Sequence, residues 1–199
     1  MAKRVNPHKF LSHEWYEWMH NNKKQIHDDF VLWTHDKAIS SILQVGCGKH
    51  DFYHRVFSSQ HYIGLDISPD VISHCLKYVD PNMCHAWECG DILTSGPWET
   101  DLVFSHNVID HSPDPDLFIR MSIESAAKYA YIMSYRGWFP NIDEHKIEKG
   151  SDGYFYNDIS VNQVRRLLDS LGYAYELKRV PTNMPKIEIQ NELHIIVTK

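Results

Sequence analysis

The sequence predicts an α/β protein: one domain with a mostly parallel sheet of seven strands, an antiparallel last strand, helices on both faces and a helical extension at the N-terminus. Short apolar runs recur along the chain, amphipathic helical patterns separate them, and several runs end at a glycine or an aspartate. Strands that alternate with helices form parallel sheets covered on both faces. A chain of 199 residues is long enough to build one such domain.

Each predicted strand is a short apolar run bounded by turn residues. The first run, SILQV, ends directly before Gly46, and the second, YIGLD, ends in Asp66. Runs of this length that stop at such residues are typical of buried strands. No helical pattern separates the last two runs, so we expect them to be antiparallel neighbours. The predicted strands are residues 41–45, 62–66, 83–91, 101–105, 129–135, 174–180 and 192–199.

Capping residues mark the predicted helices. Ser68 precedes Pro69, a residue common at the first helical position, while Ser160 opens a helix and Gly172 lies just past its end. The predicted helices are residues 12–22, 23–38, 68–79, 114–128 and 160–173, the second with apolar side chains at Ile26, Phe30, Leu32 and Trp33. We therefore expect an N-terminal helical cap over residues 1–40 and a main domain over residues 41–199.

Composition narrows the function classes. The formal net charge is -6 and the basic residues are scattered, which disfavours a nucleic-acid partner. No apolar run approaches the roughly 20 residues that cross a bilayer, and no signal peptide is visible, so we expect a cytoplasmic protein without a membrane partner. Free thiols are the default there, and zinc at Cys75, Cys84, His85 and Cys89 is disfavoured by their spacing. The oligomeric state stays open.

Parallel sheets bind ligands beyond the carboxyl ends of their strands, so the turns after the first four strands are the candidate site. Gly46 and Gly48 follow the first strand and let the backbone approach a ligand closely. Asp51 occupies the third glycine position of a dinucleotide fingerprint, which disfavours a nicotinamide cofactor. Asp66 ends the second strand and can either bind both ribose hydroxyls or cap the next helix. Asp91 can accept from an adenine amino group or be an ordinary loop residue.

Four stretches, ILQVGCGKHDF, YIGLDIS, GDI and DLVFSHNVIDHSPDP, together resemble the class I S-adenosylmethionine-dependent methyltransferases, in particular the small-molecule, methyltransferase type 11-like branch. The resemblance runs from about residue 41 to residue 135. It implies a Rossmann-like sheet and S-adenosylmethionine as the cofactor. Two positions depart from the family motif, because Gln44 stands where an acid is expected and His50 where a third glycine is expected. The resemblance implies Gly46 and Gly48 for the methionine portion, Asp66 for the ribose, Asp91 with Ile92 for the adenine, and His106 and Asn107 beside the sulfonium. Cys47 and Ile67 are further candidate cofactor-binding residues.

The turn after the fourth strand also holds candidates for the chemistry. A hydroxyl acceptor must lose its proton, and a histidine suits that task near neutral pH. We expect His111 to act as the base, with Asp110 either orienting it or pointing elsewhere. Some members of the resembled family hold a divalent cation in this register, which here would use Asn107, Asp110 and His111. The neutral amide makes a metal at Asp110 and His111 the weaker hypothesis, and a purely structural His111 is a further alternative.

Residues 136–160 form a polar, aromatic-rich segment without a regular pattern, too long for a simple connection and typical of a lid or a binding wall. Arg136 can pair an anionic group of the substrate, and His145 is a second candidate base. Trp138, Tyr154 and Tyr156 offer flat faces for a ring, although aromatic side chains are often core residues. Tyr16 and Trp18 can likewise either cover the cofactor or pack in the core.

We therefore expect a methyltransferase that moves a methyl group to a small-molecule acceptor, with the hydroxyl oxygen of a sugar or phenol as the predicted target. A metal-assisted enzyme using Asp110 and His111 is one alternative. The other is a catalytically silent module that scaffolds a partner, which the departures at Gln44 and His50 favour.

Overall fold

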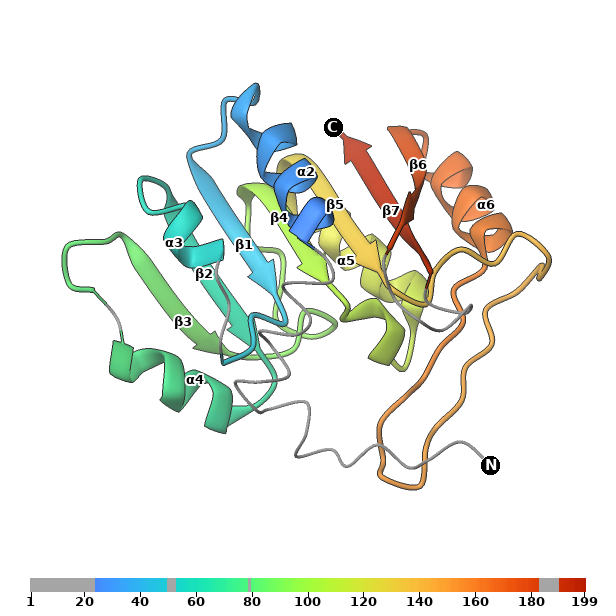
Figure 1. Ribbon diagram of the computed structural model, residues 1–199, viewed down its shortest axis with the longest axis horizontal. Coiled ribbons are helices and arrows are strands. Elements are labelled where there is room, and N and C mark those ends of the chain that lie inside the picture. Colours follow the sequence, from blue (N-terminus) through green and yellow to red (C-terminus); the bar gives the residue numbers. More distant parts are fainter. Residues whose placement is uncertain (1–23, 50–52, 79, 183–189) are drawn as a thin grey trace.

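The computed structural model describes residues 24–49, 53–78, 80–182 and 190–199. Its centre is a seven-stranded sheet in the order β3-β2-β1-β4-β5-β7-β6 (Figure 1). The sheet confirms the predicted α/β class with its seven strands. The strands are β1 (Ser41–Val45), β2 (His61–Asp66), β3 (His85–Cys89), β4 (Thr100–His106), β5 (Ala126–Ser134), β6 (Ala174–Pro181) and β7 (Asn191–Thr198).

The strand order reverses beside β1, which is the first strand in the sequence. β1 pairs in parallel with β2 on one side and with β4 on the other, so the crevice of a doubly wound sheet lies at its carboxyl end. β7 inserts between β5 and β6 and runs antiparallel to both. The last two strands are thus antiparallel neighbours, as expected, while the insertion of β7 beside β5 is a feature that the sequence pattern did not predict.

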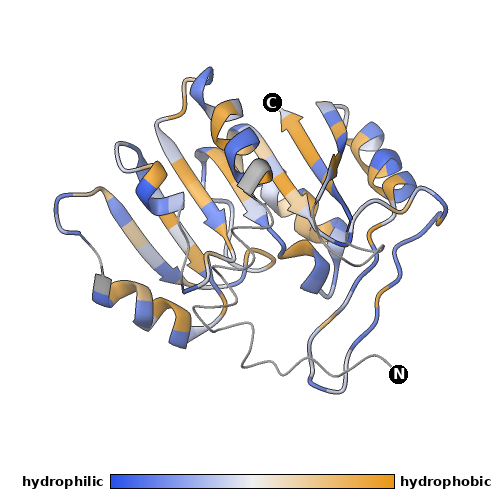
Figure 2. Cartoon of the chain, viewed as in Figure 1, coloured by the Kyte–Doolittle hydropathy of each residue, from blue (hydrophilic) through white to orange (hydrophobic). Residues whose placement is uncertain are grey.

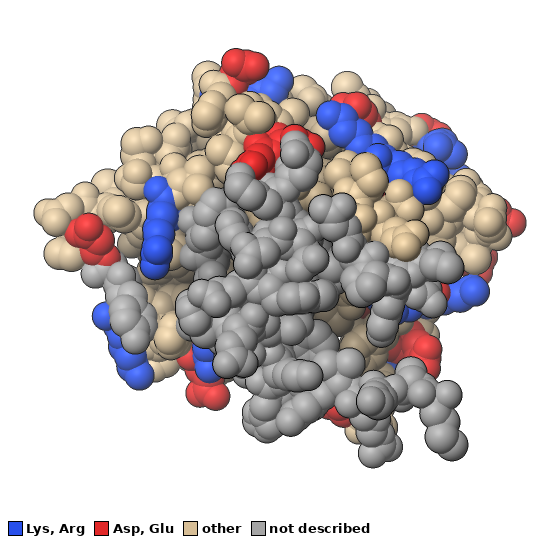
Figure 3. All heavy atoms as spheres, in the orientation of Figure 1, with Lys and Arg blue, Asp and Glu red and all other residues tan. Residues whose placement is uncertain are grey.

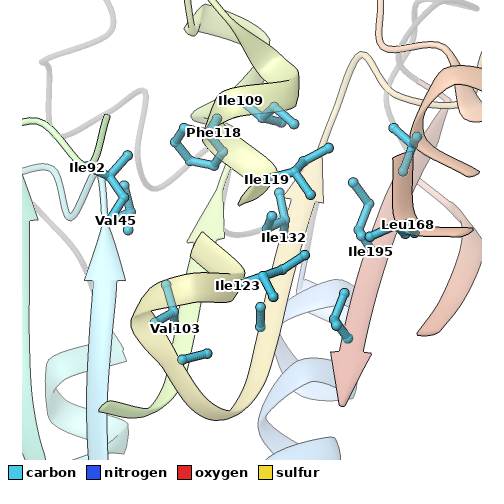
Figure 4. Close-up of a cluster of buried hydrophobic side chains, with 14 of the residues drawn as sticks. Val45, Ile92, Val103, Ile109, Phe118, Ile119, Ile123, Ile132, Leu168 and Ile195 are labelled. Atoms are coloured by element: carbon cyan, nitrogen blue, oxygen red, sulfur yellow. The ribbon is translucent and has the colours of Figure 1, made fainter. Parts of the chain in front are cut away.

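Alternate residues of the strands enter two cores, one on each face of the sheet. Leu43 and Val103 belong to the core that packs under α5 (Pro115–Ser125) and α6 (Val161–Leu171), part of which Figure 4 shows. Ile42 and Phe104, their neighbours in sequence, enter the other core with α2 (Lys24–His35) and α3 (Tyr53–Val56). The strands therefore appear as the apolar centre of the molecule in Figure 2. A fully apolar strand buried on both faces is what a parallel sheet requires.

Helix ends agree with the predicted capping residues. The Ser68 side chain accepts from the backbone N–H of Val71 at the start of α4 (Pro69–Cys75), and Ser160 accepts from that of Gln163 in α6. Gly172 ends α6 in a left-handed conformation, with φ of +73°. The N-cap of α4 is therefore Ser68 and not Asp66.

The predicted N-terminal cap is described only from α2 onward. Ile26 and Phe30 are buried against the sheet, whereas Leu32 is 60% exposed, which corrects its assignment to the apolar stripe. The physical reason is that residue 32 lies two positions from Phe30, on another side of the helix. The first predicted helix, with Tyr16 and Trp18, lies outside the described residues.

The two arms of residues 136–160 are joined by isolated bridges at Phe139–Ser160, Lys146–Asp158 and Lys149–Phe155. Figure 1 shows these arms extending from the edge at which the arrowheads of β1 to β5 end. Acidic and basic side chains are interspersed among the described residues of the face in Figure 3. The described part of the chain contains no helix long and apolar enough to cross a membrane.

Candidate active site

The turn after β1 is shaped by glycine. Gly46 and Gly48 have φ values of +69° and +65°, in the left-handed region that glycine adopts without strain. A Cβ atom on Gly46 would lie 2.3 Å from Cγ2 of Val108, in the turn after β4. The backbone N–H groups of Gly46 and Cys47 both donate to the carbonyl of Leu65. The turns after β1, β2 and β4 therefore meet at one place.

Asp66 lies at the centre of this junction. Its two carboxylate oxygens accept from the backbone N–H groups of Gly48 (3.1 Å) and Ser68 (3.0 Å). Burial nevertheless raises the pKa of Asp66, because desolvation outweighs both hydrogen bonds. A carboxylate has about four acceptor sites, so it retains capacity for hydroxyl donors. A half-buried carboxylate that already accepts two backbone hydrogen bonds and retains acceptor capacity fits a ligand that brings hydroxyl groups.

The turns after β2 and β3 differ in what they expose. Ile67 is 70% exposed, an uncommon position for an apolar side chain beside a half-buried carboxylate. Ile92 is only 2% exposed and packs with Val45 in the core (Figure 4). The side chain of Asp91 accepts from the backbone N–H of Leu93. Ile67 is therefore the exposed apolar side chain of these two turns, and Ile92 is the buried one.

The end of β4 carries a strained residue. Asn107 has φ of +62°, which is uncommon for a residue other than glycine, and its backbone N–H donates to the carbonyl of Met133. Such outliers cluster at functional sites. His106 directly precedes it and turns its imidazole toward Tyr53 and Glu192, with its side chain 8% exposed.

Asp110 and His111 follow in a short 3-10 turn and point to different partners. Asp110 is fully buried and accepts from the Ser134 hydroxyl and from the backbone N–H of Arg136. His111 places Nδ1 2.6 Å from the carbonyl of Phe155, which can only accept, so Nδ1 carries the proton and Nε2 its lone pair. Asp110 therefore holds the end of β4 to the start of the 136–160 segment. Of the two alternatives for this pair, the structure agrees with the one in which they diverge.

The described residues contain no group of three or more His, Cys, Asp or Glu side chains arranged to hold a metal ion. Asp110 and His111, the two side chains of the metal hypothesis, do not share a direction, since one faces Ser134 and the other Phe155. The four cysteines are free, with Cys47 and Cys75 buried and Cys84 and Cys89 exposed.

His145 lies away from these turns, between α5 and α6. Its Nδ1 accepts from the backbone N–H of Ser160, so its Nε2 carries the proton and faces Asp116 at 3.2 Å. The hydrogen bond from His145 is the largest cause that lowers the pKa of Asp116. Both ring nitrogens are thus engaged in contacts within the protein that hold the segment to the two helices.

The predicted substrate residues occupy different environments. Arg136 is paired with Asp158 at 2.5 Å, which leaves its charge compensated within the protein. Trp138 packs against the core under α6, as the alternative for the aromatic residues allowed. Tyr154 is 55% exposed. Tyr156 donates to Asp152, and burial together with this bond raises the pKa of Tyr156 to about 12.

A buried polar cluster beside His106 was not predicted from the sequence motifs. Glu192 and His194, on β7, are buried and lie on the same face of the sheet as His106, where Tyr131 and Tyr53 contact the two imidazoles. A charged residue and a histidine inside the apolar run ELHIIV are the signal that could have indicated them.

Gln44, which departs from the family motif, also faces this side of the sheet. It is buried, and its side-chain carbonyl accepts from the hydroxyl of Tyr62 on β2 at 2.5 Å. A neutral acceptor paired with a neutral donor suits this buried position, where a lone carboxylate would be costly. His50 and Asp51 lie outside the described residues.

Comparison with known proteins identifies the family. A family model described as a methyltransferase domain matches residues 36–173, well over half of the chain. Among curated proteins, none matches this sequence. The solved structures that share the fold include a magnesium protoporphyrin IX methyltransferase of Synechocystis with bound S-adenosylhomocysteine, which has 13% identity, a TM-score of 0.68 and coverage of 96% of this chain and 97% of that one.

Two further structures show the same fold. The N-methyltransferase NodS of Bradyrhizobium japonicum has 15% identity and a TM-score of 0.68, covering 96% of this chain and 95% of its own. A putative methyltransferase of Haloferax volcanii, solved with its Trm112 activator, has 13% identity and a TM-score of 0.68, covering 98% of both chains. The family match and the strand order of the sheet together lead to one conclusion. The chain belongs to the methyltransferase domain family and is a class I S-adenosylmethionine-dependent methyltransferase.

Proposed function

We propose that the enzyme transfers the methyl group to a hydroxyl oxygen of a small molecule, such as a sugar or a phenol. The observation that carries this proposal is the placement of imidazole groups at the carboxyl end of β4, beside the junction of Gly46, Asp66 and Val108. A hydroxyl has to lose its proton during transfer, and a neutral imidazole is the side chain best suited to receive it near pH 7. The acceptors of the structural neighbours vary, so the fold alone leaves this choice open.

The proposed cofactor contacts follow the strand ends. Gly46, Cys47 and Gly48 bring the backbone to the methionine portion, in a turn whose two glycines adopt the left-handed conformation. Asp66 accepts from the ribose hydroxyls. The assigned contacts are completed by Ile67 and Asp91 at the adenine, with Ile92 supporting the turn from the core, and by His106 and Asn107 at the sulfonium.

When bound, the cofactor supplies a methyl group on a positively charged sulfur, which leaves by in-line displacement. The chain contributes position and proton transfer. The strained turn at Asn107 brings the end of β4 against Gly46, and the 136–160 segment forms a wall on the acceptor side. Trp138 supports that wall from the core, Tyr156 and Arg136 brace it, and Tyr154 offers its exposed ring to the acceptor.

The cofactor contacts are tested by calorimetry with S-adenosylhomocysteine on the wild type, Asp66→Asn and Asp101→Asn. Asp101 is a carboxylate at the opposite edge of the sheet, so its variant is the matched control. We expect Asp66→Asn to weaken binding about tenfold to a hundredfold, as befits lost hydrogen bonds to a charged group, while Asp101→Asn binds like the wild type. Equal binding by all three proteins would contradict the role of Asp66.

The acceptor class is tested with S-adenosylmethionine labelled in its methyl group and matched pairs of hydroxyl and amine compounds. Transfer to a phenol or sugar hydroxyl is the expected result, and transfer to amines alone would contradict the proposal. The same assay repeated with a chelator addresses the metal-assisted alternative at Asp110 and His111, for which we expect unchanged rates.

The four free cysteines also support a cytoplasmic location for the enzyme.

A further inference from the structure

Three ionisable side chains meet in the core on the α2 face of the sheet. Nε2 of His106 lies 3.4 Å from Oε2 of Glu192, and Nε2 of His194 lies 3.5 Å from the same oxygen. The register explains the meeting, since His106 pairs with Met133 across β4 and β5, and Met133 pairs with His194 across β5 and β7. Glu192 lies two residues before His194 and so points to the same face. We call His106, Glu192 and His194 the triad.

Hydroxyl groups contact the far side of both imidazoles. Tyr131 places its hydroxyl 2.9 Å from Nδ1 of His194, and Tyr53 places its hydroxyl 3.5 Å from Nδ1 of His106. The same Tyr53 hydroxyl lies 2.6 Å from Nδ1 of His27 on α2. These contacts link β4, β7, α2 and α3 through polar atoms inside an otherwise apolar core.

The contacts imply where the protons lie when Glu192 is ionised. Each Nε2 then carries a proton and lies within ion-pair distance of the carboxylate, and each Nδ1 accepts from its tyrosine. His27 donates to Tyr53, which leaves the hydroxyl proton of Tyr53 for His106. Both imidazoles of the triad are neutral in this arrangement, so the triad carries one buried negative charge. A buried carboxylate is stable only with such donors around it.

We propose that His106 is the catalytic base of the methyl transfer and that Glu192, held by His194, is the positioning residue that orients it and supplies the compensating charge. The inference deepens the proposed transfer to a hydroxyl, because that reaction releases a proton. His106 is at the right edge of the sheet for this role, since Val45 pairs with Ser105 and the turn at Gly46 therefore lies beside His106.

The charges balance through the reaction. A lone pair of the acceptor oxygen forms the new O–C bond while the C–S bond breaks, and the electron pair of that bond stays on sulfur. Nδ1 of His106 receives the hydroxyl proton, replacing its 3.5 Å contact with Tyr53, the longest hydroxyl contact of the cluster. The sulfonium loses its positive charge as the triad loses its net negative charge. The buried site is thus neutral overall before and after the transfer.

The proposal is tested by the charge of the cofactor itself. S-Adenosylmethionine and S-adenosylhomocysteine differ by one methyl group and one positive charge, so a base beside the sulfur titrates at lower pH in the first complex. We expect the NMR titration midpoint of His106, assigned by loss of its signal in His106→Gln, to differ by about one pH unit between the complexes, as for a unit charge roughly 10 Å away at an effective dielectric constant near 20.

Among the described residues, the titratable groups that face His106 include His27 from α2, Tyr53 from α3, and Glu192 with His194 from β7. They are present in both complexes, so the difference isolates the sulfonium. His35, exposed at the end of α2, is the internal control and should titrate identically. A midpoint of His106 that is the same in both complexes would overturn the proposal, as would a shift seen at His111 in place of His106.

Glu192→Gln tests the positioning residue by calorimetry, without any acceptor. Removing the buried negative charge should weaken S-adenosylmethionine about tenfold and change S-adenosylhomocysteine less than about twofold, because only the first ligand is charged at sulfur. Glu176→Gln, at an exposed carboxylate on β6, is the matched control and should leave both affinities unchanged. Equal weakening of both ligands would contradict the charge role of Glu192.

Two outcomes separate this inference from the proposed function. Absence of binding by both ligands would contradict the cofactor contacts, whereas binding without a shift at His106 would contradict only the base. A nitrogen acceptor would contradict the proposed hydroxyl and leave the midpoint difference intact. If Glu192→Gln does not fold, as thermal unfolding would show, the two complexes of the wild-type protein still decide the position of His106.

Discussion

The two edges of the sheet treat their carboxylates in opposite ways. At the amino edge, burial works to raise the pKa of Asp101, but hydrogen bonds from Ser40 and the Lys128 ammonium outweigh it and lower the pKa to about 2. At the carboxyl edge, burial raises the pKa of Asp66, and its two backbone hydrogen bonds offset this only in part. One edge uses a carboxylate to stabilise the fold, while the other carries the carboxylate that we propose binds the ribose.

The largest expected effect tests the backbone at the carboxyl edge. Gly46→Ala combines a left-handed φ with a Cβ atom 2.3 Å from Val108, so we expect the free energy of unfolding to fall by about 3 kcal/mol and binding of S-adenosylhomocysteine to be lost. Gly153→Ala has the same kind of φ and no atom within 4 Å, so it should cost only about 1 kcal/mol and keep binding. Urea unfolding and calorimetry measure both quantities. Similar losses for both variants would show that φ, and not the contact with Val108, governs this turn.

Asp110 lies at the carboxyl edge like Asp66, but its hydrogen bonds from Ser134 and Arg136 hold the fold together. It therefore tests whether the two edges really differ in the use of their carboxylates. Asp110→Ala removes the acceptor of Ser134 and of the Arg136 backbone, and we expect a loss of about 2 to 3 kcal/mol in urea unfolding. Asp114→Ala, which removes the N-cap of α5, should lower the free energy of unfolding by about 1 kcal/mol and is the control with which Asp110→Ala is compared. A destabilisation no greater than that of Asp114→Ala, together with lost cofactor binding, would place Asp110 with the ligand-binding groups instead.

The pH dependence of stability sharpens the comparison. The folded-state pKa of Asp101 is about 2 and its ordinary value is 3.8, so Asp101 adds stability above pH 4 that disappears as the pH falls toward 2. Allowing for solvent screening, Asp101→Asn should cost about 1 kcal/mol at pH 7 and nothing near pH 2. The pKa of Asp66 is raised, so its contribution to stability falls as the pH rises above 3.8.

Urea unfolding between pH 2.5 and 7 measures both carboxylates. Asp66→Asn should therefore gain stability relative to the wild type as the pH rises, while Asp101→Asn should lose it. Parallel curves for the two variants would remove the difference between the edges.

The smallest expected effect concerns the exposed part of the 136–160 segment. Tyr154 is exposed and contributes little to packing, so Tyr154→Ser should change the free energy of unfolding by less than about 0.5 kcal/mol. Its effect is expected in KM for a phenolic acceptor, with affinity for S-adenosylhomocysteine unchanged. A change in cofactor affinity would show that this segment belongs to the cofactor side.

Local patterns predicted what local forces decide. The run SILQV became β1 with the same bounds, and Ser160 and Gly172 delimit α6, because short apolar runs, caps and left-handed glycines act within a few residues. Ile67 and Ile92 show the limit of this reasoning, since which of two similar side chains enters the core depends on packing of distant strands.

The acceptor side was harder to predict for the same reason. Glu192 meets His106 only because β7 inserts beside β5, and no spacing in the sequence expresses that insertion. The role of His145 likewise depends on Asp116 and Ser160, two partners from other elements. Polar pairs formed between distant segments determine both positions, whereas the proposed cofactor contacts come from consecutive strand ends.

The anchoring of the 136–160 segment has a consequence for its exposed bend. Arg136 pairs with Asp158 and so ties the roots of the two arms to each other, His145 ties the segment to α5 and α6, and a methyl group added at Gly153 would meet no atom within 4 Å. Exposed side chains at the bend, such as Tyr154, can therefore change without disturbing the contacts that anchor the two arms.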